Sequence, residues 1–154
     1  MEFETEVNAF LASAAEHGLR IIMVGGAAVN HHGYKRHSAD VDLWIEPNAE
    51  NFQKLVGVLT ELGYEVGELP ERVKSAEQNI SIKISPAQEI ELITRFNPGC
   101  TFDEAWSRCE FGETRGLPLA RYRVLGSADL IASKLRSARP KDLLDVQELK
   151  RIKG

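Results

Sequence analysis

The chain has 154 residues, of which 43% are hydrophobic and 27% charged, with a formal charge of −4 at neutral pH. This composition predicts one compact globular domain over residues 1–154 and excludes intrinsic disorder. The longest apolar stretch, Ile21 to Val29, is far shorter than the ~20 residues that a membrane-spanning helix needs. The negative charge argues against a large nonspecific nucleic-acid surface, but it is compatible with a local basic groove.

The N-terminus carries no basic segment followed by an apolar one, so no secretory signal is predicted. The two cysteines, Cys100 and Cys109, lack a metal-binding spacing, and a reduced state is the default for them. We therefore expect a cytoplasmic protein with no membrane association.

The first half of the chain predicts helices that alternate with strands. Apolar residues recur at a helical period from Phe3 to His17, and Gly18 is a suitable stop. A short apolar strand is expected at 20–24, ended by Gly25-Gly26. The next expected elements are a short helix at 27–32, a strand at 40–46, and a helix at 49–62 that Asn48 caps and that turns Phe52, Leu55, Val56 and Leu59 toward the core.

The second half predicts short strands and then helices. Residues 79–84 and 89–94 alternate apolar and polar side chains and predict an antiparallel pair. Thr101 and Glu104 have the spacing of a capping box. The remaining elements are an extended segment at 117–125, a helix at 128–138 capped by Ser127, and a last helix at 141–150 with Pro140 in its first turn. The sum is an α+β fold with a mixed central sheet flanked by helices.

Two glycines and two aspartates carry the functional prediction. After Gly25-Gly26 come the 13 residues 27–39 and then Asp40-Val41-Asp42, inside a predicted strand. Alternate residues of a strand share a face, so Asp40 and Asp42 point the same way, about 6–7 Å apart. Two carboxylates at ~4 Å repel by about 4 kcal/mol at an effective dielectric of about 20, which favours a cation between them. Paired carboxylates suit Mg²⁺ or Mn²⁺.

Each half of this pattern has an ordinary structural explanation. Solvated strand ends often carry two acids, and strand-to-helix turns often need glycine. Glycine also lets the backbone approach a ligand and offer its N–H groups to phosphate oxygens. The two features joined at this spacing are much more specific than either alone.

Gly25-Gly26 and the segment 36–43 together resemble the signature of the nucleotidyltransferase fold superfamily, the DNA polymerase β-like group. The resemblance continues at Ile90-Glu91-Leu92, which matches the strand that supplies a third acid. Segments 129–134 and 139–145 resemble the C-terminal Lys/Asp motif of the subgroup related to abortive-infection and type IV toxin nucleotidyltransferases. In total the resemblance covers residues from about 19 to 149, and minimal single-domain members are similar in size.

The resemblance implies the nucleotidyltransferase fold and a role for each matched residue. Gly25 and Gly26 would cradle a triphosphate through backbone amides. Asp40 and Asp42 would each bind two divalent ions, and Glu91 would complete the ion that activates the acceptor hydroxyl. Two such ions ~3.5–4 Å apart stabilise the attacking and leaving oxygens of an in-line displacement.

Two glutamates are candidates for the third acid. Family members usually have aspartate where Glu91 stands, and Glu89 lies two residues earlier on the same predicted face. A solvated acid on an edge strand is the alternative explanation for Glu91.

Further nucleotide-binding candidates are Arg36, Ser38 and Lys134. A guanidinium before the aspartates can clamp a phosphate, and a hydroxyl can contact one; a solvated arginine and a local turn are the alternatives. Lys134 shares a helix face with apolar residues, so its ammonium needs a partner. Asp142, in the first turn of the next helix, is one partner in a supporting role, and a nucleotide phosphate is the other.

Other polar and aromatic residues have structural explanations that are at least as good. Neighbouring residues on a helix point apart, so His31-His32 is not expected to bind metal. Trp44 and Trp106 are expected in the core rather than stacked on a base. A local basic patch that could meet RNA, or form an ordinary helix surface, consists of Lys134, Arg136, Arg139 and Lys141.

The sequence thus predicts a metal-dependent nucleotidyltransferase that moves a nucleoside monophosphate from a nucleoside triphosphate to RNA or tRNA, a protein or a small molecule. A toxin–antitoxin or phage-defence setting is weakly favoured. The alternative is a catalytically weak binding module, or a toxin–antitoxin component acting with a partner protein, because this length leaves no room for an acceptor-gripping helical domain. A phosphohydrolase lacks a distinct nucleophile or base here.

Overall fold

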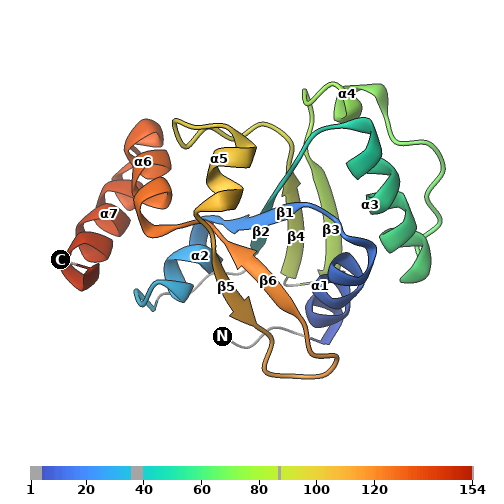
Figure 1. Cartoon of the computed structure of the whole chain (residues 1–154), viewed down its shortest axis with the longest axis horizontal. Helices are drawn as coiled ribbons and strands as arrows, with labels where there is room; N and C mark the ends of the chain where they lie inside the picture. Colours follow the sequence, from blue (N-terminus) through green and yellow to red (C-terminus); the bar gives the residue numbers. More distant parts are fainter. Residues whose placement is uncertain (1–4, 36–39, 87, 154) are drawn as a thin grey trace.

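The computed structural model describes residues 5–35, 40–86 and 88–153. Within them, six strands form one mixed sheet in the order β3-β4-β2-β1-β6-β5 (Figure 1). The strands are β1 (Ile21–Val24), β2 (Val41–Ile45), β3 (Ile80–Ser85), β4 (Gln88–Ile93), β5 (Glu110–Glu113) and β6 (Arg121–Val124). The helices are α1 (Thr5–His17), α2 (Gly25–His31), α3 (Ala49–Glu61), α4 (Glu71–Lys74), α5 (Phe102–Ser107), α6 (Ser127–Ser137) and α7 (Pro140–Lys153). The predicted α+β class is confirmed.

The sheet has a hairpin at each edge and its most buried strands in the middle. β1 runs antiparallel to β2 and parallel to β6, and β2 runs parallel to β4. The edge hairpins are β3–β4, as predicted, and β5–β6. All four residues of β1 are buried, as the continuous apolar run predicts for a central strand.

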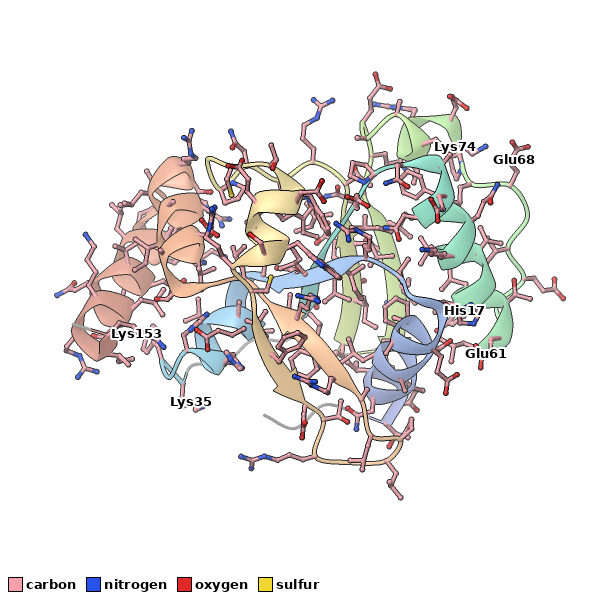
Figure 2. All side chains as sticks on the ribbon, viewed as in Figure 1. His17, Lys35, Glu61, Glu68, Lys74 and Lys153 are labelled. Atoms are coloured by element: carbon pink, nitrogen blue, oxygen red, sulfur yellow. The ribbon has the colours of Figure 1, made fainter. Side chains whose placement is uncertain are left out.

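Helices α1 and α3 pack against each other beside the sheet. At their ends, Nε2 of His17 lies 2.6 Å from Oε2 of Glu61, two residues labelled in Figure 2. The Ser13 hydroxyl donates to the same carboxylate oxygen at 2.8 Å. These hydrogen bonds, first from Ser13 and then from His17, hold the pKa of Glu61 below its ordinary value.

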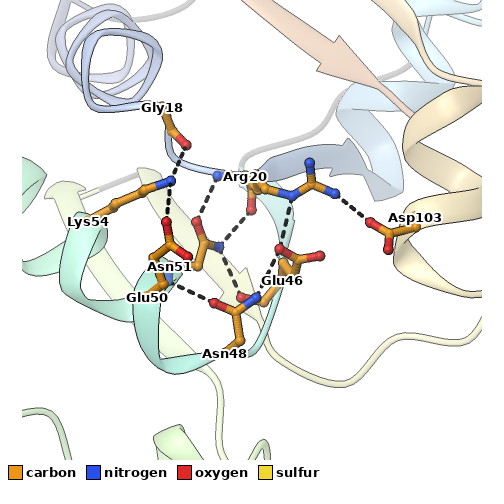
Figure 3. Close-up of polar contacts among 8 residues, drawn as sticks. All are labelled: Gly18, Arg20, Glu46, Asn48, Glu50, Asn51, Lys54 and Asp103. Carbon is orange, nitrogen blue, oxygen red and sulfur yellow. Dashed lines mark hydrogen bonds and ion pairs between the residues drawn. The ribbon is translucent and has the colours of Figure 1, made fainter.

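A buried asparagine ties α3 to the sheet. The Asn51 amide donates to the carbonyl oxygens of Arg20 and Glu46, and its Oδ1 accepts from the Arg20 N–H (Figure 3). Asn51 is only 2% exposed, so water cannot replace these partners. One side chain therefore satisfies three backbone groups, before β1 and after β2.

Several helix ends follow the predicted rules. Gly18 follows α1 with φ +67°, a conformation that glycine adopts without strain. Asn48 caps α3 by accepting from the Asn51 N–H, and Thr101 with Glu104 forms the full capping box of α5. Pro140 is the first residue of α7.

Other local predictions are wrong. α2 begins at Gly25 instead of residue 27. Gly126, not Ser127, is the N-cap of α6, and Ser127 already lies in the helix without a capping hydrogen bond. On α3, Val58 is buried where Val56 was expected, and Val56 is half-buried.

Two short elements were not predicted. The extended segment at 117–125 contains a strand only at Arg121–Val124. Its partner β5 lies at Glu110–Glu113, where a single large apolar residue shows no strand alternation. α4 is a single turn of four residues.

None of the helices within the described residues combines the length and apolar run that crossing a membrane requires.

Replacing Asn51 by alanine is expected to lower the free energy of unfolding by about 2–4 kcal/mol, because three part-buried backbone hydrogen bonds to Arg20 and Glu46 are lost. Urea unfolding measures this change. Asn48→Ala, which removes a helix cap nearby, is the control and should cost about 1 kcal/mol. Equal losses in both variants would contradict the role assigned to Asn51.

Candidate active site

The register of three neighbouring strands brings the glycine and acidic motifs together. Asp42 lies opposite Val24 of β1 and opposite Glu91 of β4. Residues directly opposite on paired strands point to the same face, and neighbouring strands are about 4.8 Å apart. The side chains of Asp42 and Glu91 are therefore adjacent on one face, although 48 residues separate them in sequence.

Gly25 follows Val24 directly and lies against Asp42. Its φ is +63°, and a Cβ built on it would overlap the Asp42 carboxylate. Any other residue would both strain the backbone and displace this carboxylate. Gly25 lines the adjoining cleft, whereas Gly26, the second residue of α2, is not among the residues that line it.

Asp42 is electrostatically strained in this position. Burial, and after it the negative charges of Glu91 and Asp40, raise the pKa of its carboxyl to about 6. The cations Lys134 and Lys141 act in the opposite direction. The acids of the predicted motif are thus close enough to repel one another, and two lysines of the C-terminal helices lie near enough to offset part of that repulsion.

The two candidates for the third acid have different neighbours. Oε1 of Glu91 accepts a hydrogen bond of 3.3 Å from the amide of Asn79, which sequence analysis did not single out. Glu89 lies opposite Lys83 of β3, an oppositely charged partner, and it is not among the charges that perturb Asp42. The geometry thus places Glu91, rather than Glu89, beside Asp42.

A cleft of about 230 Å³ opens between Asp42 and the C-terminal helices. In Figure 1, α6 and α7 lie together at the end of the molecule where β1 runs into α2. Residues that line the cleft include Gly25, Asp42, Phe96, Lys134, Arg139 and Asp142. It therefore joins the predicted glycine, acid and lysine motifs in one cavity.

Lys134 is held between two aspartates of α7. Its Nζ lies 3.0 Å from Asp145 and 3.5 Å from Asp142, and all three side chains are at most 8% exposed. Arg139 completes the cluster, with Nε 2.7 Å from Asp142. The predicted Lys134–Asp142 ion pair is thus present, extended to two aspartates and an arginine, and it fixes the ammonium at the cleft wall.

The structure describes some of the remaining candidate residues and not others. Arg36 and Ser38 lie outside the described residues. Trp44 is 4% exposed, with its ring centroid 5.1 Å from that of Phe96, so the core prediction is correct for Trp44. Trp106 packs against the core but is only half-buried. The rings of His31 and His32 face Glu110, each with a nitrogen 3.5 Å from that carboxylate.

The donor set at Asp40, Asp42 and Glu91 matches what a divalent cation requires. All three side chains offer carboxylate oxygens, the ligands that Mg²⁺ and Mn²⁺ prefer, and their mutual repulsion raises the pKa of Asp42. In the described part of the chain, however, no three His, Cys, Asp or Glu side chains already stand close enough to hold an ion. Ion binding therefore requires these carboxylates to turn inward.

Comparison with known proteins gives a fold and no close relative. No protein-family model matches the chain, and no curated protein matches it. A solved structure, the lincosamide antibiotic adenylyltransferase LnuA with lincomycin bound, is similar with a TM-score of 0.56 and 20% identity, covering 98% of each chain. This likeness over almost the whole of both chains confirms the nucleotidyltransferase fold.

Asp42→Asn is expected to stabilise the metal-free protein above pH 6, by about 1–3 kcal/mol. A carboxyl whose pKa is raised by folding holds its proton more tightly when folded, so wild-type stability falls as pH rises from about 4 to 6. The asparagine variant lacks this loss and should match wild type near pH 3, where both side chains are neutral.

Urea unfolding between pH 3 and 8, with Glu89→Gln as control, measures the effect. Added Mg²⁺ should stabilise wild type and leave Asp42→Asn almost unchanged. A difference between wild type and Asp42→Asn that does not vary with pH would contradict the electrostatic explanation.

Proposed function

We propose that this protein is a divalent-metal-dependent nucleotidyltransferase. It transfers a nucleoside monophosphate from a nucleoside triphosphate to an acceptor hydroxyl or phosphate and releases pyrophosphate. The observation that carries this proposal is the position of Asp42, which lies beside Glu91 in the sheet and lines one cleft together with the Gly25 backbone, in a fold shared with an adenylyltransferase.

In the reaction, an acceptor oxygen forms a bond to the α-phosphorus while the bond to the bridging oxygen of the β-phosphate breaks. Asp40, Asp42 and Glu91 would hold the divalent ions, which supply charge stabilisation and activation of the acceptor oxygen. The Gly25 backbone lies against Asp42 and lines the cleft without a side chain, so it can approach a phosphate there closely.

Lys134 and Arg139 supply positive charge on the opposite wall. The Lys134 ammonium is fixed by Asp142 and Asp145, so it acts at a set position and not as a mobile side chain. The Arg139 side chain is 60% exposed, and its guanidinium can exchange an Asp142 oxygen for a phosphate oxygen. Their role is to bind and orient the triphosphate.

The acceptor belongs to one of the classes that the reaction allows: RNA, a protein side chain or a small molecule. The LnuA structure contains lincomycin, so a small hydroxyl-bearing acceptor is compatible with this fold. We expect the reaction to take place in the cytoplasm, where triphosphates are available and where the free thiols of Cys100 and Cys109 are stable.

Replacing Asp40 and Asp42 together by asparagine is expected to lower nucleotide transfer by about a thousandfold or more, because the ion-binding carboxylates are lost. Titration calorimetry of each of the four nucleoside triphosphates in Mg²⁺ should show binding to wild type and none to the double variant. Labelled triphosphate then measures transfer.

Circular dichroism must show that the double variant is folded. Robust transfer by this variant would refute the assignment. Triphosphate binding without transfer to any acceptor would favour the binding-module alternative, and copurification of a second protein would support it.

Replacing Glu91 and Glu89 one at a time tests which of them acts as the third acid in the transfer reaction. Glu91→Gln is expected to lower transfer by about a hundredfold, because Glu91 lies beside Asp42. Glu89→Gln, the matched control on the same strand face, should stay within about threefold of wild type. The reverse order of effects would reassign the third acid to Glu89.

A further inference from the structure

A second pocket, separate from the cleft, is lined by apolar side chains of α1 on one side and by arginines and aromatic rings on the other. It has a volume of about 240 Å³ and is bordered by α1, α5 and the β5–β6 hairpin. The residues that define this arginine pocket are Arg20, Trp106, Phe111, Arg121 and Arg123. The proposed transfer reaction uses none of them.

The guanidinium groups and rings form one stacked row. The Arg123 guanidinium carbon lies 3.8 Å from the Trp106 ring centre and 4.7 Å from that of Phe111. Arg121 lies 4.2 Å from the Phe111 ring centre, and Arg20 lies 4.4 Å from that of Trp106. Stacking occupies the flat faces of the guanidinium groups and leaves their N–H edges available for hydrogen bonds.

The positive charge in this row is only partly compensated. The Arg20 guanidinium donates to Glu46 and Asp103, as Figure 3 shows. Arg123, in contrast, donates to the carbonyl oxygen of Trp106 at 3.3 Å, and within the described residues no carboxylate forms an ion pair with it. Arg121 has Glu113 4.0 Å away, with both side chains more than 60% exposed. Such an exposed pair is weak.

The row ends in exposed groups. Phe111 is 47% exposed, and the Arg121 side chain is 63% exposed. Both lie on the edge hairpin, and among the strands of the described residues none pairs with the outer side of β5. The loop that joins β5 to β6 adds the exposed residues Arg115 and Leu119. The pocket is therefore open along the sheet edge, which suits an extended ligand better than an enclosed small one.

A ligand that matches this row must carry both flat rings and negative charge. A base can extend the stack on Arg121, the exposed end of the row, while the backbone phosphates take the N–H edges of Arg121 and Arg123. We propose that the arginine pocket binds single-stranded nucleic acid. The proposal concerns binding alone and does not depend on the transfer reaction.

The arginines of the pocket and Asp42 of the cleft lie on the same face of the sheet. Strand alternation puts Arg123 on the same sheet face as Ile22, Trp44 and Asp42. Trp44 and Phe102 lie 4.9 Å apart and Phe102 and Trp106 5.8 Å apart, so contacting rings join the core beside the cleft to the pocket. A nucleic acid bound in the arginine pocket would thus lie on the same face of the sheet as the acids. Its role as the acceptor rests on the proposed function.

Fluorescence anisotropy with a labelled single-stranded RNA of about 12 nucleotides tests the proposal. Arg121→Ala/Arg123→Ala is expected to weaken binding about tenfold or more and to reduce the slope of log affinity against log salt by about 1.4, for two lost phosphate contacts. The control Arg72→Ala/Arg151→Ala makes the same change in net charge outside the pocket and should stay within about twofold of wild type.

Further variants keep each outcome interpretable. Arg121→Lys/Arg123→Lys retains the charge and loses stacking, so its affinity should fall between wild type and the alanine pair, even if the alanine pair is unstable. RNA binding is measured without a triphosphate, so its outcome does not depend on whether the protein transfers nucleotides. Equal weakening by the control pair, absent RNA binding, or displacement of RNA by AMP at equal nucleotide concentration would overturn the proposal.

Discussion

The register between β1, β2 and β4 is the constraint on which the candidate site depends. It sets Asp42 opposite Val24 on one side and opposite Glu91 on the other. A slip of one residue in either pairing would turn the carboxylates to opposite faces of the sheet and separate them. The slip is opposed by the core, because Val41, Leu43 and Ile45 are all at most 3% exposed on the other face and would have to exchange places with polar residues.

This register carries an electrostatic cost, which the rest of the fold offsets. The Asp42 carboxyl is partly buried beside two other acids and has a raised pKa. The compensating cations come from the C-terminal helices, where Lys134 is held by two aspartates and lies near Asp42. Polar anchors elsewhere, such as Asn51 between α3 and the ends of β1 and β2, keep the strands in place without contributing to the site. Repulsion between acids that a fold holds close together is typical of functional positions.

Local patterns in the sequence were enough to predict most elements and part of the site. The alternation around Asp42, the cap at Asn48 and the capping box at Thr101 depend on neighbours within a few residues, and the structure has all three. β5 could not be predicted, because it exists through pairing with β6 and not through its own composition. Asn79 could not be recognised either, since its contact with Glu91 arises from the bulged β3–β4 hairpin. The arginine pocket is the extreme case: its members range from residue 20 to residue 123, and no single segment shows the pattern.

The two candidate sites have opposite charge, and their arrangement on one sheet face has a physical consequence. A net charge of −4 would repel a nucleic acid at long range, but the stacked guanidinium groups concentrate positive charge at one edge of the sheet, where screening over about 8–10 Å leaves mainly local interactions. At the other end, Asp42 and Glu91 repel phosphates unless cations are bound. A strand on this face would therefore rest its phosphates on the arginines, and the group nearest the acids would be a terminal hydroxyl, which carries no charge. Under both proposals, this distribution of charge would favour an acceptor whose phosphates lie on the arginines and whose uncharged hydroxyl lies nearest the acids.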